Sequence, residues 1–374
     1  MDMQSVPLWI YPLAFLLVLG PLVTLHELGH YLVGRFFGVG AEAFSVGFGK
    51  ELAGFTDKRG TRWKLSAIPI GGYVQFKGDM NPASVPDPEH PPQPDDFHSK
   101  PLWQKALIVA AGPFANILIA VSIFAAFFMV LGEPVPSDAS QENVIAGFSE
   151  ESPAQAAGLR EGDRVVAVEG ETVRSVRELI MEIAPYPNTE LDITVDRDGE
   201  EVTVAIITQA DERTDDFGNK AVYGVIGIYP GRSEEEYREV GPVESLNLAV
   251  DASVGTVDII VTGIGQILSG KRSVQELGGP ITIAKVSGEQ LSLGWLPFVT
   301  FAALISLNLA FINLLPIPAL DGGHLAFYAV EAIRRKPASA RSMEWAYRVG
   351  IATVLALMLF VTVIDIAKLP FFGS

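Results

Sequence analysis

Four long apolar runs alternate with polar segments along the chain. They lie at about 7–31, 106–131, 293–317 and 349–367, and the second and third contain no charged residue. A helix needs about 20 apolar residues to cross a bilayer. The pattern predicts four transmembrane helices, because charge-free runs of this length are difficult to bury in a soluble protein. A cleaved signal peptide is a poor interpretation of the first run, since no basic segment precedes it.

A fifth apolar segment, residues 246–268, differs from these runs in its charges. Asp251 and Asp258 lie two helical turns apart and therefore near one face of a helix. A charged residue near the bilayer centre costs roughly 2.5–3.5 kcal/mol. We therefore expect an amphipathic helix on the membrane surface, within a linker that covers residues 231–290.

Alternating apolar positions between the first two runs indicate β structure. Phe44, Val46 and Phe48 alternate with small or polar residues, and residues 63–67 repeat the alternation after a turn-like sequence. Residues 70–76 predict a further strand. The whole β-hairpin region is expected at 42–77, with a proline-rich loop after it at 78–101.

The charged residues are concentrated between the second and third apolar runs. The chain has 374 residues and a formal net charge of −17, and residues 133–241 hold 25 of its 44 acidic residues but only 9 of its 27 basic ones. This predicts one acidic soluble insert in a nearly neutral membrane protein. No nucleic-acid partner is expected, because no basic patch dominates any part of the chain. The lack of cysteine excludes disulfides, thiolate ligands and a cysteine nucleophile.

Lysine and arginine residues beside the apolar runs predict the orientation. Nine of them lie between the first and second runs and four more between the third and fourth, whereas the N-terminal tail has none. Loops rich in these residues stay in the cytoplasm. Both termini and the acidic insert are therefore expected outside.

The sequence HELGH at positions 26–30 predicts a metal site at the inner end of the first run. His26 and His30 are one helical turn apart, so both imidazoles can reach one ion. Glu27 lies beside them and can take a proton from water at the metal. The alternative is a pair of structural helix histidines with an incidental glutamate.

A zinc site needs a third protein ligand, and the best region for it is 313–324. Pro316 and Pro318 interrupt the helix there, so that Asp321 or His324 can be presented from the break. The first and third runs cross the membrane in the same direction, which brings this segment to the depth of the histidines. The residues alone leave both ligands open.

Three motifs follow one another along the chain: HELGH at 26–30, AGPFAN at 111–116 and NLLPIPALDGG at 313–323. Together they resemble the site-2 protease family of intramembrane zinc metalloproteases, and within it the branch of the bacterial regulator of sigma-E proteases. The resemblance implies a polytopic helical membrane protein of the bacterial inner membrane. Its zinc site would lie near the cytoplasmic side, with the termini and the insert in the periplasm.

The resemblance also implies the ligand set. It assigns Zn²⁺ to His26, His30 and Asp321, and it makes Glu27 the general base.

Residues for binding substrate are implied in the same way. Asn313 and Asn308 would hold the substrate strand, and Asn116 would line the catalytic region. Gly71 and Gly72 open a membrane-associated strand whose edge could hold an unwound substrate segment. Alternatives are a helix-to-helix hydrogen bond for Asn116, a cap for Asn313 and a packing role for the hairpin.

The acidic insert resembles a PDZ domain of the bacterial protease type. Its sequence from residue 144 to residue 173 is VIAGFSEESPAQAAGLREGDRVVAVEGETV. The resemblance implies one extracytoplasmic α+β domain at 133–230, between the second and third spans. Better-known members of the branch carry two such domains, and this insert has room for one. The domain could bind an extended peptide by strand addition or exclude bulky ectodomains.

These expectations combine into one function. The protein would be a zinc endopeptidase that cleaves transmembrane segments in regulated intramembrane proteolysis. By resemblance, its substrates are single-pass membrane proteins already trimmed by another protease, such as anti-sigma factors, or remnant signal peptides; membrane lipid surrounds it. The alternatives are an inactive metal-binding scaffold that recruits partners through its PDZ domain, and a metal transporter. Spans two and three lack the ionisable residues that transport requires.

Overall fold

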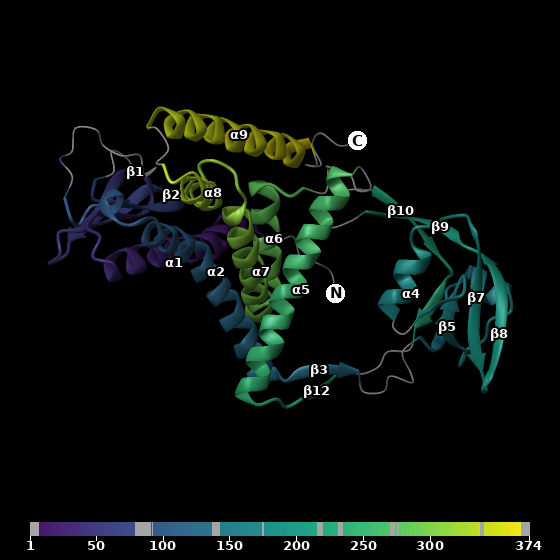
Figure 1. Ribbon diagram of the computed structural model, residues 1–374. Coiled ribbons are helices and arrows are strands. Elements are labelled where there is room, and N and C mark those ends of the chain that lie inside the picture. Colours follow the sequence, from purple (N-terminus) through teal and green to yellow (C-terminus); the bar gives the residue numbers. More distant parts are fainter. Residues whose placement is uncertain are drawn as a thin grey trace. The chain divides into compact units, whose positions relative to one another are not determined.

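The computed structural model describes residues 7–78, 91, 93–136, 143–173, 176–214, 220–230, 235–269, 274, 277–336 and 340–367. The chain forms two compact units. One combines Met1–Val130 with Gly241–Ser374, and the other is Leu131–Val240. The first unit contains the long helices and the long β-hairpin, and the second contains most of the short strands (Figure 1).

The helices of the first unit account for every apolar run. They are α1 (Ile10–Phe36), α2 (Leu102–Leu131), α5 (Pro242–Leu268), α6 (Pro280–Leu293), α7 (Trp295–Leu314), α8 (Asp321–Arg334) and α9 (Ala340–Ala367), with a 3₁₀ turn η1 (Phe97–Ser99). Among the described helices, α1, α2, α5, α7 and α9 are long and apolar enough to cross a membrane. The chain is thus a multi-pass helical membrane protein. It has one candidate span more than the four runs, and the surface position of α5 stays a prediction.

Small residues let these helices approach one another closely. Ala120 of α2, Ala249 of α5 and Ala303 of α7 are fully buried in one cluster. In α6, a side chain at Gly288 would overlap the Tyr11 ring of α1. Such contacts are typical of helix packing in membranes, where van der Waals contact replaces the hydrophobic effect as the driving force.

A break in the chain after α7 presents the start of α8. α7 ends at Leu314 because Pro316 and Pro318 follow, and neither can donate a backbone hydrogen bond to continue the helix. The backbone then turns through Ala319, whose φ is 79°, and α8 begins at Asp321. The first residue of α8 is therefore a carboxylate held by a rigid turn.

The β region is one bent hairpin of β1 (Ala41–Thr56) and β2 (Arg62–Phe76). Residues 43–46 pair with 62–65 on one side and with 72–75 on the other. Gly47 and Gly49 permit the bend, with φ of 87° and 89°. The expected further strand is thus the second half of β2, and it forms an outer edge of the small sheet.

The second unit is an α+β fold with its own core. Its elements are β3 (Glu133–Pro136), β4 (Ile145–Phe148), α3 (Pro153–Ala156), β5 (Arg164–Val168), β6 (Glu171–Thr172), α4 (Val176–Ile183), β7 (Glu190–Arg197), β8 (Glu200–Ile207), β9 (Gln209–Thr214), β10 (Lys220–Val225), β11 (Ile228–Pro230) and β12 (Glu235–Arg238). One sheet has the order β6-β5-β7-β8, and β11 pairs with β4. Ile145, Leu179 and Ile193 belong to the buried core. The PDZ assignment stays a prediction.

Candidate metal centre

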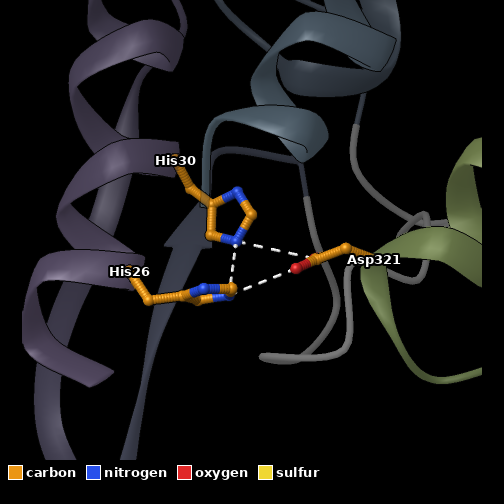
Figure 2. Close-up of side chains that lie close together, drawn as sticks. All are labelled: His26, His30 and Asp321. Atoms are coloured by element: carbon orange, nitrogen blue, oxygen red, sulfur yellow. Dashed lines mark hydrogen bonds and ion pairs between the residues drawn. The ribbon is translucent and has the colours of Figure 1, made fainter. Parts of the chain in front are cut away.

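Two elements bring three ligand side chains together. Residues four apart lie on one face of a helix, so α1 directs His26 and His30 to the same side. Asp321 comes from the first turn of α8, and Figure 2 shows it opposite both rings. His26 Nε2 lies 3.1 Å from Asp321 Oδ2, and His30 Nε2 lies 3.5 Å from Asp321 Oδ1. The two Nε2 atoms are 3.2 Å apart.

The spacing and chemistry of these atoms fit Zn²⁺. Zinc–nitrogen bonds of about 2.0–2.1 Å at tetrahedral angles place ligand atoms about 3.3 Å apart, close to the three separations above. Asp321 Oδ2 is buried and has no hydrogen-bond partner among the described residues, although His26 Nε2 is near. A buried, unpartnered carboxylate oxygen is costly, and a cation removes that cost. Within the described part of the chain, these three residues form the group able to hold a metal.

One face of α2 supports both histidines. His30 Nδ1 lies 2.9 Å from the carbonyl oxygen of Ile108, which can only accept, so Nδ1 donates and Nε2 keeps its lone pair for a metal. One turn on, a Cβ at Gly112 would overlap His30 Nε2 and lie 2.8 Å from His26 Nε2. A further turn on, Asn116 lies 3.2 Å from His26 Nδ1.

A cavity of about 580 Å³ is lined by the three ligand residues and by residues 71–74 in the outer half of β2. Glu27 lines it, and its Oε2 accepts a hydrogen bond of 3.1 Å from the backbone N–H of Val74. The carboxylate is therefore fixed by β2 while it faces the same space as the histidines. An acid, three ligand residues and a strand edge line one cavity, as hydrolysis of an extended peptide requires.

The predicted site residues divide into two groups. Asn313, Gly71 and Gly72 line the cavity. Asn116 is fully buried and Asn308 is half-buried, and neither is among the described residues that line it. Substrate contact by all five stays a prediction.

The two alternatives for the third ligand lie in different positions. Asp321 is in the ligand cluster, whereas His324 lines the same cavity but lies outside that cluster.

Sequence reasoning missed the groups that act through the backbone. The N–H of Val74 and the carbonyl of Ile108 carry no side-chain signature, and Gly112 matters because it lacks a side chain. Tyr347 of α9 also lines the cavity. It lies far along the chain from HELGH and outside the three motifs, so the sequence did not indicate this position. The glycine within AGPFAN was a signal of close approach that could have been used.

Comparisons with known proteins agree over almost the whole chain. The family model described as Peptidase family M50 matches residues 14–357. A relative in Agrobacterium fabrum, named as a candidate zinc metalloprotease, is 42% identical over 96% of each chain. A relative of the same description in Brucella suis is 40% identical over 94% of each chain. Metalloprotease MmpA of Caulobacter vibrioides is 35% identical over 96% of each.

Proposed function

Because the chain belongs to peptidase family M50, the site-2 protease family of zinc metallopeptidases, we propose that it cleaves transmembrane segments of single-pass membrane proteins within the bilayer. The predicted family, the enzyme class and Zn²⁺ as the cofactor are thereby confirmed. The proposal extends to substrates already trimmed by another protease, such as anti-sigma factors or remnant signal peptides, in regulated intramembrane proteolysis. Membership of the sigma-E branch also remains a proposal.

The observation that carries the proposal is the shared cavity of Glu27, the ligand cluster and the β2 edge. His26, His30 and Asp321 would hold the zinc. When bound, zinc supplies a Lewis acid that polarises water and the scissile carbonyl. Glu27 takes the proton from the attacking water and returns it to the leaving amine. Its hydrogen bond to Val74 keeps the carboxylate oriented for both transfers.

The second half of β2, at the outer edge of the sheet, supports the proposal that the substrates are transmembrane segments. A peptide bond inside a helix is shielded by its own hydrogen bonds, so a transmembrane substrate must first unwind. An unwound segment can pair with a strand edge beside the site, which supplies the backbone partners that the bilayer lacks. Gly71, Gly72 and Asn313 line the cavity on its path. Asn308 would contribute farther from the metal.

One experiment tests the mechanism. Wild-type protein in detergent is expected to contain zinc and to cleave a model single-pass substrate. Glu27→Gln should retain zinc and lose cleavage, whereas Asp321→Ala should lose both. Asp258→Asn, at an exposed position of α5, serves as the control and should match wild type. Cleavage by Glu27→Gln at the wild-type rate would exclude the mechanism, and full zinc content in Asp321→Ala would exclude the ligand set.

Residues 131–240 favour a second function, which is peptide binding. A cavity of about 760 Å³ is lined by Leu179, Ile180 and Ile183 of α4 and by residues 223–229. Among the described strands, β11 pairs only with β4, so an extended peptide could pair with its other edge as in PDZ domains. The same groove would serve an inactive scaffold, but the presence of Glu27 beside the ligand cluster argues against that alternative.

Two neighbouring residues of α4 make a matched test of this groove. Ile180 lines the cavity and is 59% exposed, while Met181 is 60% exposed and lies outside the lining. Ile180→Glu should weaken binding of apolar C-terminal peptides to the full-length protein, and Met181→Glu should not. Equal binding by both variants would exclude the groove as the peptide site.

We also propose the bacterial inner membrane as the location, with the insert and both termini in the periplasm. The chain has no cysteine, so single cysteines are clean reporters of sidedness. A membrane-impermeant maleimide should label Glu200→Cys in intact spheroplasts. Lys336→Cys, at an exposed position just after α8, should react only after permeabilisation. The reverse pattern would invert the proposed orientation.

A further inference from the structure

We propose that Asn116 is a positioning residue for the zinc ligand His26, with its side-chain oxygen Oδ1 turned toward His26 Nδ1. The inference rests on the ligand set proposed above. It assigns Asn116 a place behind the ligands, since its side chain is fully buried and contacts the imidazole directly.

The tautomer of His26 determines what its partner must be. Nε2 of His26 points at the ligand cluster, 3.1 Å from Asp321 Oδ2 and 3.2 Å from His30 Nε2. A neutral imidazole that binds metal through Nε2 carries its hydrogen on Nδ1. The group beside Nδ1 must therefore accept a hydrogen bond.

The amide of Asn116 can provide either a donor or an acceptor. In the structure its Nδ2 lies 3.2 Å from His26 Nδ1, and its Oδ1 is buried without a hydrogen-bond partner among the described residues. In the zinc-bound state the N–H groups of Asn116 Nδ2 and His26 Nδ1 would then face each other, while Asn116 Oδ1 would accept no hydrogen bond from them. A rotation of the amide by 180° preserves its shape and brings Oδ1 to the imidazole N–H.

The two histidines are then supported in the same way by α2. His30 donates from Nδ1 to the carbonyl of Ile108, two turns before Asn116 on the same helix face. Ser306 of α7 donates its hydroxyl to the backbone carbonyl of Asn116 over 2.8 Å and so fixes this turn against the core. Each ligand ring thus has one acceptor from α2, a backbone oxygen for one and an amide oxygen for the other.

Zinc affinity of the full-length protein in detergent, measured by competition with a chromogenic chelator, tests the assignment. Asn116→Leu removes the acceptor and should weaken zinc binding by about 10–100-fold, the usual effect of losing such a partner. Asn116→Asp keeps an acceptor and has no donor, so its affinity should stay within about three-fold of wild type or increase. Ser253→Ala is the control: it removes a buried hydroxyl that donates to the carbonyl of Ala249 within α5, and it should leave zinc affinity unchanged.

The outcomes separate an acceptor from other roles. If Asn116→Asp loses zinc as Asn116→Leu does, the side chain acts as a donor or a packing element and the proposal is wrong. Wild-type affinity in a folded Asn116→Leu variant overturns it as well. Because Asn116→Asp is nearly isosteric, the result does not depend on whether the leucine variant folds. Failure of the wild-type protein to bind zinc would instead contradict the proposed ligand set itself.

Discussion

The backbone N–H of Val74 donates a hydrogen bond of 3.1 Å to Glu27 Oε2, which joins the outer strand of the β-hairpin to the acidic residue of α1. The same strand lines the cavity through Gly71 and Gly72. A substrate that pairs with this strand would therefore be placed in register with the base.

The first prediction concerns the space between the edge strand and Glu27. A Cβ at Gly72 would lie 2.7 Å from the carbonyl oxygen of Ser45 and 3.4 Å from Glu27 Cγ. Gly72→Val should therefore displace both the strand and the base, and we expect cleavage to fall by about ten-fold or more at normal zinc content. The measurement is kcat/KM on a model transmembrane substrate, with zinc content determined in parallel.

Ala53→Val is the control for this substitution, because Ala53 is exposed on the opposite outer strand of the same sheet. It adds similar bulk away from the site and should leave cleavage unchanged. Equal losses in the two variants would indicate a general effect on the hairpin, and no loss in Gly72→Val would contradict close packing at the base.

The second prediction concerns the contact of α2 with the ligand rings. Gly112→Ala places a methyl group against His30 and 2.8 Å from His26 Nε2. Alanine favours a helix over glycine by about 1 kcal/mol, so propensity alone would stabilise the variant. We nevertheless expect zinc affinity to fall by at least about ten-fold, because the rings must move from their positions. Gly20→Ala, with open space around it in α1, is the control and should bind zinc normally.

The sequence predicted the parts of this site that depend on spacing along one element. His26, Glu27 and His30 lie within a single helical turn, and the proline break before Asp321 is local. Contacts between elements distant in the chain could not be derived in this way. The hydrogen bond from Val74 to Glu27 and the cap that Asp365 provides for α6 depend on tertiary packing. Nothing in the local sequence specifies either partner.

Hydrophobic pattern predicted the long helices well but could not decide the position of α5. Its length and composition suffice for a span, while Asp251 and Asp258 disfavour one. Both are exposed in the structure, and Ala249 packs against α2 and α7. Burying the two charges costs free energy and helix packing gains it. The balance depends on how deep the two aspartates lie in the bilayer, and the sequence does not specify that depth.

The third prediction concerns the pH dependence of the second unit. Arg197 donates to both oxygens of Asp163, at 2.6 and 2.7 Å, and these hydrogen bonds hold the pKa of Asp163 below its usual range. Burial opposes this, and the backbone N–H of Arg160 adds to it. Because the pKa is lower in the folded than in the unfolded state, the stabilisation is present above about pH 4 and is lost as the pH falls below it.

Calorimetric unfolding of the full-length protein between pH 3 and pH 7 checks this. The transition of the second unit should move to lower temperature below about pH 4 in wild type. Asp163→Asn should unfold at lower temperature at pH 7 and show a smaller shift on acidification. Asp192→Asn is the control, because Asp192 is exposed on β7 of the same unit. This variant should unfold as wild type does. An unchanged acid shift in Asp163→Asn would assign the effect to other carboxylates.

The fourth prediction concerns a buried carboxylate that joins α9 to α6. Asp365 is 2% exposed and accepts hydrogen bonds of 3.0 Å from the N–H groups of Gly279, Ile281 and Thr282, and one of 2.6 Å from the Thr282 hydroxyl. The first N–H groups of a helix lack partners within the helix, and here one side chain satisfies them. Asp365→Ala leaves these donors buried and unpaired, and should destabilise the first unit by about 1–3 kcal/mol.

Thermal unfolding in detergent compares this variant with Asp365→Asn and Asp258→Ala. The asparagine variant retains one acceptor oxygen and should fall between wild type and Asp365→Ala. Asp258→Ala removes an exposed carboxylate from α5 and should have little effect. Because the hydrogen bonds of Asp365 go to the start of α6, which carries no zinc ligand, zinc affinity should stay close to the wild-type value. If Asp365→Ala unfolds at the wild-type temperature, the carboxylate does not hold α9 on α6, and another contact must do so.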